Sequence, residues 1–119
     1  MSDNQEFRKV YTYKKRKEES GKIREKYPNK IPVIVEKCIG NHQLDNIVNK
    51  KYLVPGDLTL GEFIFIIRKR IKLKPEQAIF ILINDIVPPP SSLMSELYEK
   101  YKDDDNFLYC LYYGESVFG

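Results

Sequence analysis

Few residues in this sequence have side chains that could catalyse a reaction or bind a metal. The 119 residues contain one histidine, His42, and two cysteines, Cys38 and Cys110. His42 has small polar neighbours typical of a loop, and the cysteines lie among apolar residues without CxxC spacing. We therefore expect two buried free thiols, no disulfide and no metal site. No Ser/His/Asp or Cys/His combination can be assembled, so we expect neither a catalytic residue nor a cofactor.

The remaining candidate for chemistry is the carboxylate of the last residue, Gly119. Glycine has no Cβ and adopts backbone conformations that other residues avoid. A terminal glycine can therefore enter a narrow enzymatic channel and present its carboxylate for activation and transfer. It can equally be a solvated end without a function. The sequence before Gly119 is therefore needed to distinguish these two interpretations.

Length and composition indicate one soluble globular domain. A core is achievable with 119 residues, and the 42% hydrophobic and 31% charged residues are typical of such a domain. No apolar run approaches the roughly 18 residues of a membrane span, and the first residues lack the pattern of a signal peptide. We therefore expect a cytoplasmic protein.

Positive charge is concentrated near the N-terminus. Between Arg8 and Lys30 there are ten basic residues and three acidic ones, although the net charge of the whole chain is only +3. This asymmetry is typical of a surface that docks onto something acidic, such as lipid headgroups, nucleic acid or an acidic protein. A solvated helix face with internal ion pairs explains it equally well.

The first half of the sequence predicts a helix and two strands. Thr12 can cap a helix from Tyr13 to Lys26 that Pro28 ends. The β-branched residues of 31–38 predict a strand, and residues 51–54 predict a second strand that Pro55 and Gly56 stop. The two strands are expected to form a hairpin with a long connection.

The second half predicts two helices and two strands. Asp57 or Thr59 can cap a helix whose apolar residues recur at helical spacing. These residues are Leu60, Phe63, Ile64, Ile67 and Ile71. The continuous apolar run 78–83 predicts a central strand buried on both faces. Ser92 or Ser95 can start a short helix, and residues 107–113 predict an interior last strand.

This order of elements predicts the fold class α+β, as a ubiquitin-like β-grasp with a four-stranded mixed sheet around a central helix. We divide the chain into a basic helical extension (1–28), the β-grasp core (29–114) and a flexible C-terminal conjugation tail (115–119), all within one compact domain. Fold alone does not establish function.

Several long strings of residues resemble one family. They are Lys22-Ile23-Arg24-Glu25-Lys26-Tyr27-Pro28, Ile31-Pro32-Val33-Ile34-Val35-Glu36-Lys37, Lys51-Tyr52-Leu53-Val54-Pro55, Asp57-Leu58-Thr59, Ile67-Arg68-Lys69-Arg70, Phe107-Leu108-Tyr109 and Glu115-Ser116-Val117-Phe118-Gly119. In this order they are similar to the autophagy ubiquitin-like modifiers, which include GABARAP and the microtubule-associated protein light chains. The resemblance extends from about Tyr13 to Gly119.

The resemblance implies two additional N-terminal helices and a conjugation reaction. Gly119 would be activated by an E1-like enzyme, passed to an E2-like enzyme and joined to phosphatidylethanolamine. Phe118 would be recognised by a processing and deconjugating cysteine protease. Two acyl chains suffice for stable anchoring, at about 0.8 kcal/mol per buried CH₂. The protein would be monomeric and cytoplasmic when free, and bound to autophagosomes or other vesicles when lipidated. Gly119 would be either encoded last or exposed by cleavage.

The resemblance also implies capture of cargo receptors that carry aromatic-x-x-aliphatic motifs, by addition of the peptide to an exposed edge strand at 51–53. The residues implied for the aromatic pocket are Glu19, Ile23, Pro32, Lys51, Leu53 and Phe107. Those implied for the aliphatic pocket are Tyr52, Val54, Pro55, Leu58, Phe63 and Ile66. Lys30, Lys51 and Arg70 would attract the acidic residues that flank such peptides.

The sequence departs from the family pattern before the edge strand and at the N-terminus. Asn49 stands where a lysine is usual, which should weaken selection for acidic flanks, and the loop 38–50 is about one residue longer. Two other classes of function compete with the modifier. One is a non-conjugated β-grasp scaffold. The other is a nucleic-acid binder, which is disfavoured because the chain has no aromatic RNA-binding pattern and no phosphate-binding glycine loop. We therefore expect no nucleic-acid partner.

Overall fold

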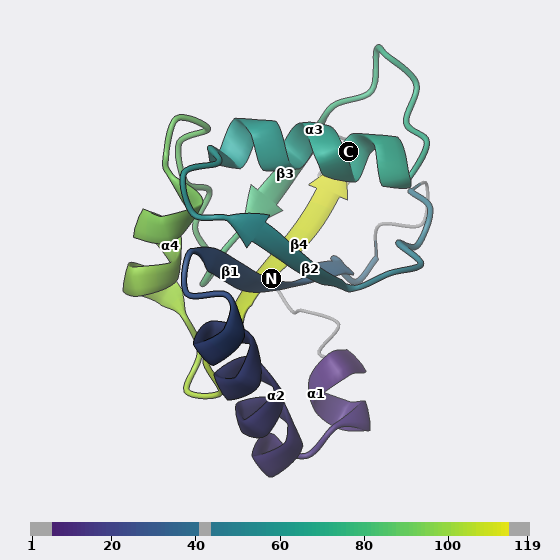
Figure 1. The fold of residues 1–119 in the computed structure, drawn as a ribbon. Coiled ribbons are helices and arrows are strands. Elements are labelled where there is room, and N and C mark those ends of the chain that lie inside the picture. The colour runs from purple at the N-terminus through teal and green to yellow at the C-terminus, as the bar shows by residue number, and fades with distance from the viewer. Residues whose placement is uncertain (1–5, 41–43, 115–119) are drawn as a thin grey trace.

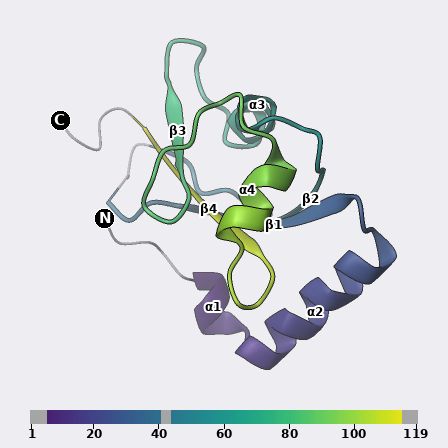
Figure 2. The same cartoon turned by 90° about the vertical axis from the view of Figure 1, so that its left-hand side faces the viewer.

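The structure, a computed structural model, describes residues 6–40 and 44–114. Their elements are α1 (Glu6–Val10), α2 (Tyr13–Lys26), β1 (Lys30–Lys37), β2 (Lys51–Pro55), α3 (Leu60–Arg70), β3 (Ile79–Leu82), α4 (Met94–Tyr101) and β4 (Leu108–Gly114). The four strands form one sheet in the order β2-β1-β4-β3. One face of the sheet packs on α3, and α1 and α2 lie against the other face (Figures 1 and 2). This arrangement confirms the predicted β-grasp fold with two N-terminal helices.

The sheet is mixed. Strands β1 and β2 form the predicted antiparallel hairpin, with Val33 opposite Tyr52. Strands β1 and β4 are parallel and occupy the two interior positions, and β3 pairs antiparallel with β4. The prediction that residues 107–113 form an interior strand is therefore confirmed.

The prediction of a central strand at 78–83 is wrong, because β3 lies at an edge of the sheet. The residues of β3 are apolar because they pack into two separate clusters. Ile79 and Ile81 belong to the main core, while Leu82 packs with Cys38 and Tyr113 in a smaller cluster. Both faces of β3 are thus partly covered although one of its edges is unpaired. Phe80 remains 38% exposed.

Helix α3 begins with a capping box, and Thr59 rather than Asp57 is its N-cap. The Thr59 hydroxyl accepts a hydrogen bond from the Glu62 N–H (3.1 Å), and the Glu62 carboxylate accepts one from the Thr59 N–H (2.9 Å). The expected apolar stripe then faces the sheet. Its members Leu60, Phe63 and Ile67 are fully buried, which makes α3 the centre of the core.

The short helix α4 starts neither at Ser92 nor at Ser95, because its N-cap is Leu93. The Leu93 N–H donates to the Glu96 carboxylate at 3.0 Å. Two backbone hydrogen bonds fix this start against the segment before α3. The Met94 N–H donates to the Leu58 carbonyl and the Leu60 N–H donates to the Ser92 carbonyl, each at 2.8 Å. Tertiary pairing, rather than a serine cap, therefore places α4.

Helix α2 has the predicted bounds and the predicted cap, because the Thr12 hydroxyl accepts a hydrogen bond from the Lys15 N–H at 3.2 Å. Only Ser20 of this helix is fully buried. The preceding helix α1 is anchored through Phe7, which packs with Ile34 and Phe107 on the face of the sheet opposite α3.

The two cysteines are free and buried, as predicted. Burial raises the pKa of the Cys110 thiol to about 12, so this thiol stays protonated at neutral pH. Among the described residues, no helix is long and apolar enough to cross a membrane, and no group of three or more acidic, histidine or cysteine side chains could hold a metal ion.

Candidate peptide-binding edge

Within residues 6–40 and 44–114, strand β2 is an edge strand that pairs with β1 alone. Side chains alternate along a strand. Tyr52 and Val54 therefore point toward α3, and Lys51 and Leu53 point toward α2. The free backbone edge of β2 lies between these two sides. An extended peptide added to this edge would contact both of them.

On the α2 side, the structure brings together the residues expected to form the aromatic pocket. Glu19 of α2 forms an ion pair with Lys51, and Leu53 lies opposite Pro32 in the β1–β2 register. Ile23 packs against the cluster that contains Phe107. Of this group, Glu19, Ile23, Lys51 and Leu53 are at least partly accessible, while Pro32 is buried.

Phe107 is only 1% exposed, because α1 contributes to its cover. The rings of Phe7 and Phe107 meet edge to face with centroids 5.5 Å apart. The sequence patterns gave no indication of Phe7. On the α2 side, Phe107 therefore lies beneath Ile23, which packs against its cluster.

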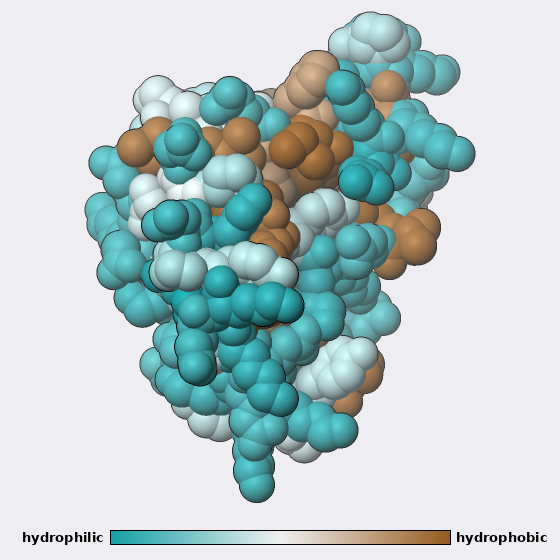
Figure 3. Space-filling view, viewed as in Figure 1, coloured by the Kyte–Doolittle hydropathy of each residue, from teal (hydrophilic) through white to brown (hydrophobic). Residues whose placement is uncertain are grey.

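On the α3 side, most of the residues expected to form the aliphatic pocket lie together. The rings of Tyr52 and Phe63 meet edge to face with centroids 5.7 Å apart, and Val54 is buried next to them. Leu58 and Ile66 are partly buried against the same core. Figure 3 shows hydrophobic side chains recessed between α3 and β2.

The Tyr52 hydroxyl is buried and has no hydrogen-bond partner among the described residues. Burial raises the pKa of this phenol. Among the described residues the ring is therefore held by packing, and burial favours its neutral form.

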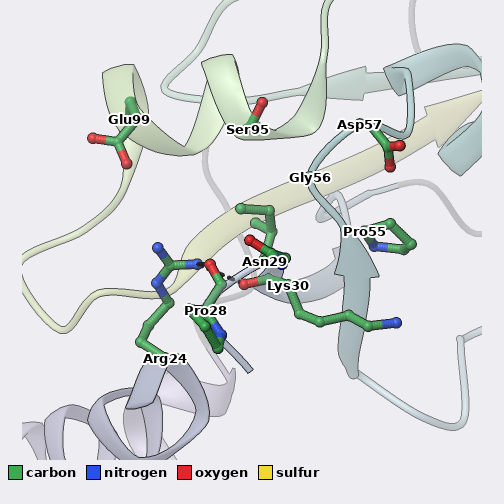
Figure 4. Close-up of a pocket in the computed structure, with 10 residues that line it drawn as sticks. Arg24, Pro28, Asn29, Lys30, Pro55, Gly56, Asp57, Ser95 and Glu99 are labelled. Carbon is green, nitrogen blue, oxygen red and sulfur yellow. Dashed lines mark hydrogen bonds between the residues drawn. The ribbon is translucent and has the colours of Figure 1, made fainter. Parts of the chain in front are cut away.

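Pro55 is placed differently from the rest of the aliphatic group. It lines a cavity of about 490 Å³ at the end of β2, together with Arg24, Pro28 and Lys30 (Figure 4). The Arg24 guanidinium donates to the Lys30 carbonyl at 2.7 Å and to the Pro28 carbonyl at 3.0 Å. Arg24 thus fixes the turn from α2 into β1.

The other expected flank cation, Arg70, ends α3 and is exposed. Lys30 lies opposite Pro55 in the register of β1 and β2. Lys30 therefore lies at the end of the β1–β2 pair, and Arg70 lies at the end of α3.

A second charged group lies where β2 begins. The Lys50 ammonium is 2.8 Å from the Glu6 carboxylate and 3.4 Å from the Glu36 carboxylate. Glu36 is buried and also accepts a hydrogen bond from the Phe7 N–H at 3.0 Å. These contacts fix α1 beside the first residue of the edge strand. Sequence patterns did not identify them, because they join residues far apart in the chain.

Asp105 fixes α2 in a similar way. Its carboxylate is fully buried and accepts hydrogen bonds from Arg16 Nε (2.8 Å), the Phe107 N–H (2.9 Å) and the Tyr109 hydroxyl (2.5 Å). Burial, reinforced by the bond to Asp105, raises the pKa of Tyr109.

The expected conjugation residues, Gly119 and Phe118, lie outside the described residues. The last described element is β4, which ends at Gly114 and occupies an interior position in the sheet. Gly119 follows Gly114 by five positions in the sequence.

Comparison with known proteins identifies the family. Residues 15–119 match the family model described as autophagy protein Atg8 ubiquitin like. Autophagy-related protein 8 of Schizosaccharomyces pombe is 54% identical over 114 residues, which cover 96% of this chain and 93% of that protein. Autophagy-related protein 8e of Arabidopsis thaliana is 53% identical over 119 residues, which cover 100% of this chain and 97% of that protein.

A solved structure agrees with these relatives. The crystal structure of Trypanosoma brucei ATG8 superposes with a TM-score of 0.89 at 41% identity, and the alignment covers 96% of this chain and 97% of the other. The family model and the relatives extend over nearly the whole sequence, and the fold agrees with them. This chain therefore belongs to the Atg8 family of ubiquitin-like autophagy proteins.

Proposed function

We propose that this chain is a modifier that is joined to phosphatidylethanolamine through Gly119 and that recruits proteins carrying aromatic-x-x-aliphatic motifs along β2. E1-like and E2-like enzymes would attach the lipid, and a cysteine protease would remove it. The lipidated form would reside on autophagosomes or other cytoplasmic vesicles. Membership of the Atg8 family supports both parts of the proposal.

The observation that best supports peptide capture is the position of β2 between two differently lined sides. The two named residues of an aromatic-x-x-aliphatic motif are three positions apart. In an extended peptide, side chains three positions apart point to opposite faces. A peptide paired with β2 would thus direct its aromatic residue toward Ile23 and Leu53 and its aliphatic residue toward Tyr52 and Phe63.

The exposed backbone of β2 would supply affinity, and the two sides would supply specificity. The order of the two sides along β2 also gives the direction of the peptide. The aromatic side begins at Lys51, and the aliphatic side extends to Leu58 beyond the end of the strand. The peptide would therefore run parallel to β2.

The peptide site can be tested by titrating a Trp-x-x-Leu peptide into the Tyr52→Ala/Leu53→Ala variant. We expect a loss of about 2 kcal/mol or more in binding free energy, the scale of an interface hot spot. Phe80→Ala is the matched control. Phe80, like Leu53, is 38% exposed, and it lies on β3, the other edge strand of the sheet. Unchanged titration curves for the double variant would reject β2 as the site.

The lipid attachment can be tested with the cognate E1-like and E2-like enzymes and liposomes that contain phosphatidylethanolamine. Intact mass should show transfer to the wild type and none to Gly119→Ala, because the side chain obstructs the approach of the carboxylate. Gly21→Ala is the control, since a Cβ at Gly21 meets no atom within 4 Å. Equal lipidation of Gly119→Ala and wild type would contradict the proposal. Peptide binding without any lipidation would favour the non-conjugated scaffold.

A further inference from the structure

We propose that the groove between α1 and residues 48–51 binds an apolar side chain of the captured peptide, two positions before its aromatic residue. This inference rests on the proposed peptide site along β2. It adds a third subsite and predicts that this chain selects an apolar residue where a cationic surface would select an acidic one.

The groove is a cavity of about 260 Å³, and its lining combines the apolar side chains of Phe7, Val10, Tyr11 and Val48 with the polar ones of Glu6, Asn49, Lys50 and Lys51. Val10 and Tyr11 of the α1 end form one side, and Val48 of the loop before β2 forms the other. Val48 is 98% exposed and Val10 is 64% exposed, so both side chains are available to a partner. Figure 3 shows hydrophobic atoms over α1 and over this loop, separated by hydrophilic ones.

The lysines at the groove already have acidic partners within the protein. Lys50 pairs with Glu6 and Glu36, and Lys51 pairs with Glu19. The neighbouring residue is the uncharged Asn49. An acidic residue of a peptide would have to displace one of these internal pairs, which would offset the attraction that it gains. An apolar residue requires no such exchange.

The groove is continuous with the edge strand, because Lys50 and Lys51 line it and Lys51 is the first residue of β2. A peptide parallel to β2 would have its N-terminal flank at this end. Residues two positions apart in a strand point to the same face and lie about 6.6 Å apart. The residue two before the aromatic one would therefore return to the face that carries α1 and α2.

The α1 side of the groove is held in place before a peptide arrives. The Phe7 ring packs on Phe107, and the Phe7 N–H donates to the buried Glu36 carboxylate at 3.0 Å. On the next residue, Arg8 forms an ion pair with Asp103 at 3.0 Å and lies 3.9 Å from the centre of the Tyr109 ring. A preformed wall reduces the ordering cost of binding.

The test uses three peptides that share a Trp-x-x-Leu motif and differ only two positions before the tryptophan, where they carry leucine, glycine or aspartate. Calorimetric titration into the full chain should show about five-fold tighter binding of the leucine peptide than of the glycine peptide, since burying part of a leucine side chain contributes about 1 kcal/mol. The aspartate peptide should bind no more tightly than the glycine peptide.

Val48→Asp should abolish the preference for leucine and leave binding of the glycine peptide within about two-fold, because Val48 contributes to the groove and not to the two main pockets. Val87→Asp, at another exposed valine beside α4, should keep the preference. Equal binding of the leucine and glycine peptides, or tightest binding of the aspartate peptide, would overturn the inference alone. Failure of all three peptides to bind would overturn the inference and the proposed peptide site together.

Discussion

The two faces of the sheet are covered by different kinds of interaction. On the α3 face, aliphatic and aromatic side chains such as Phe63, Ile67 and Ile81 form one large core whose central members are fully buried. On the other face, the described residues form two small buried apolar clusters, one of Phe7, Ile34 and Phe107 beside α1 and one of Cys38, Leu82 and Tyr113 beside β3. Buried acidic groups, Glu36 and Asp105, hold that face together.

This difference indicates a division of roles. The apolar core is non-directional and supplies most of the free energy of folding. Hydrogen bonds and ion pairs contribute less net stability but require defined geometry. The polar contacts therefore set the position of α1 and α2 relative to β2, and with it the shape of the candidate site. Three comparisons test this division, beginning with the largest expected effect.

The same truncation on the two faces should have unequal costs. Ile67→Ala should lower the free energy of unfolding by about 3 kcal/mol, because it leaves a cavity in the buried core. Ile23→Ala, at a half-buried isoleucine of α2, should cost about 1 kcal/mol. Urea denaturation followed by circular dichroism measures both values. Equal losses would show that the two faces contribute alike.

Asp105→Asn should cost about 2 kcal/mol, because it leaves Arg16 without a charged partner in a largely buried position. The loss should fall mainly on the extension, so amide hydrogen exchange should speed up more in α2 than in α3. Asp104→Asn is the control, since Tyr13 and Lys17 bond to the Asp104 carbonyl and not to its side chain. A uniform increase in exchange across both helices would contradict the separate role of this face.

Tyr109→Phe should cost about 1 kcal/mol at neutral pH, the value of a lost hydrogen bond to Asp105. Burial and Asp105 raise the pKa of Tyr109 above its ordinary value of 10.0, so the folded state favours the protonated phenol. That contribution is fully present below about pH 10 and decreases as the pH rises further.

The wild type should therefore lose stability more steeply than Tyr109→Phe above about pH 10, and the difference between them should shrink. Urea denaturation from neutral to about pH 11 measures both curves. Cys110 and Tyr112, whose pKa values burial raises to about 12, act in the same direction in both proteins and cancel in the comparison. Parallel curves would show that the Tyr109 phenol does not titrate differently in the folded state.

Local sequence patterns were sufficient to predict helices whose caps and apolar spacing lie within a few neighbouring residues. The stripe from Leu60 to Ile71 and the cap at Thr59 predicted α3, and the cap at Thr12 predicted the start of α2. The position of β3 at an edge of the sheet could not be predicted in this way. An apolar run indicates that a strand is buried, but it does not indicate the order of the strands. Its burial comes from two clusters on opposite faces of an edge strand.

The candidate site was predictable where residues are close in the sequence and unpredictable where they are not. The hairpin pattern predicted the strand at 51–54, and the resemblance implied that residues 51–53 form a peptide-binding edge. In contrast, Phe7 meets Glu36 across 29 positions and Arg16 meets Asp105 across 89. A charged residue gives no local indication that a distant partner will bury it. Glu36 directly follows the apolar run 31–35 of β1, and this position was the signal in the sequence that could have identified it.

The parallel pairing of β1 and β4 gives this domain a particular mechanical behaviour. Their register runs from Val33 opposite Leu108 to Lys37 opposite Tyr112. Tension applied between the N-terminal end of β1 and the C-terminal end of β4 would slide these strands past each other. All the hydrogen bonds between them would then bear load together, whereas pulling a hairpin open breaks its bonds in turn. In the proposed function, a protein bound along β2 and a lipid joined to Gly119 would apply tension across the sheet, and the parallel pairing of β1 and β4 would resist it.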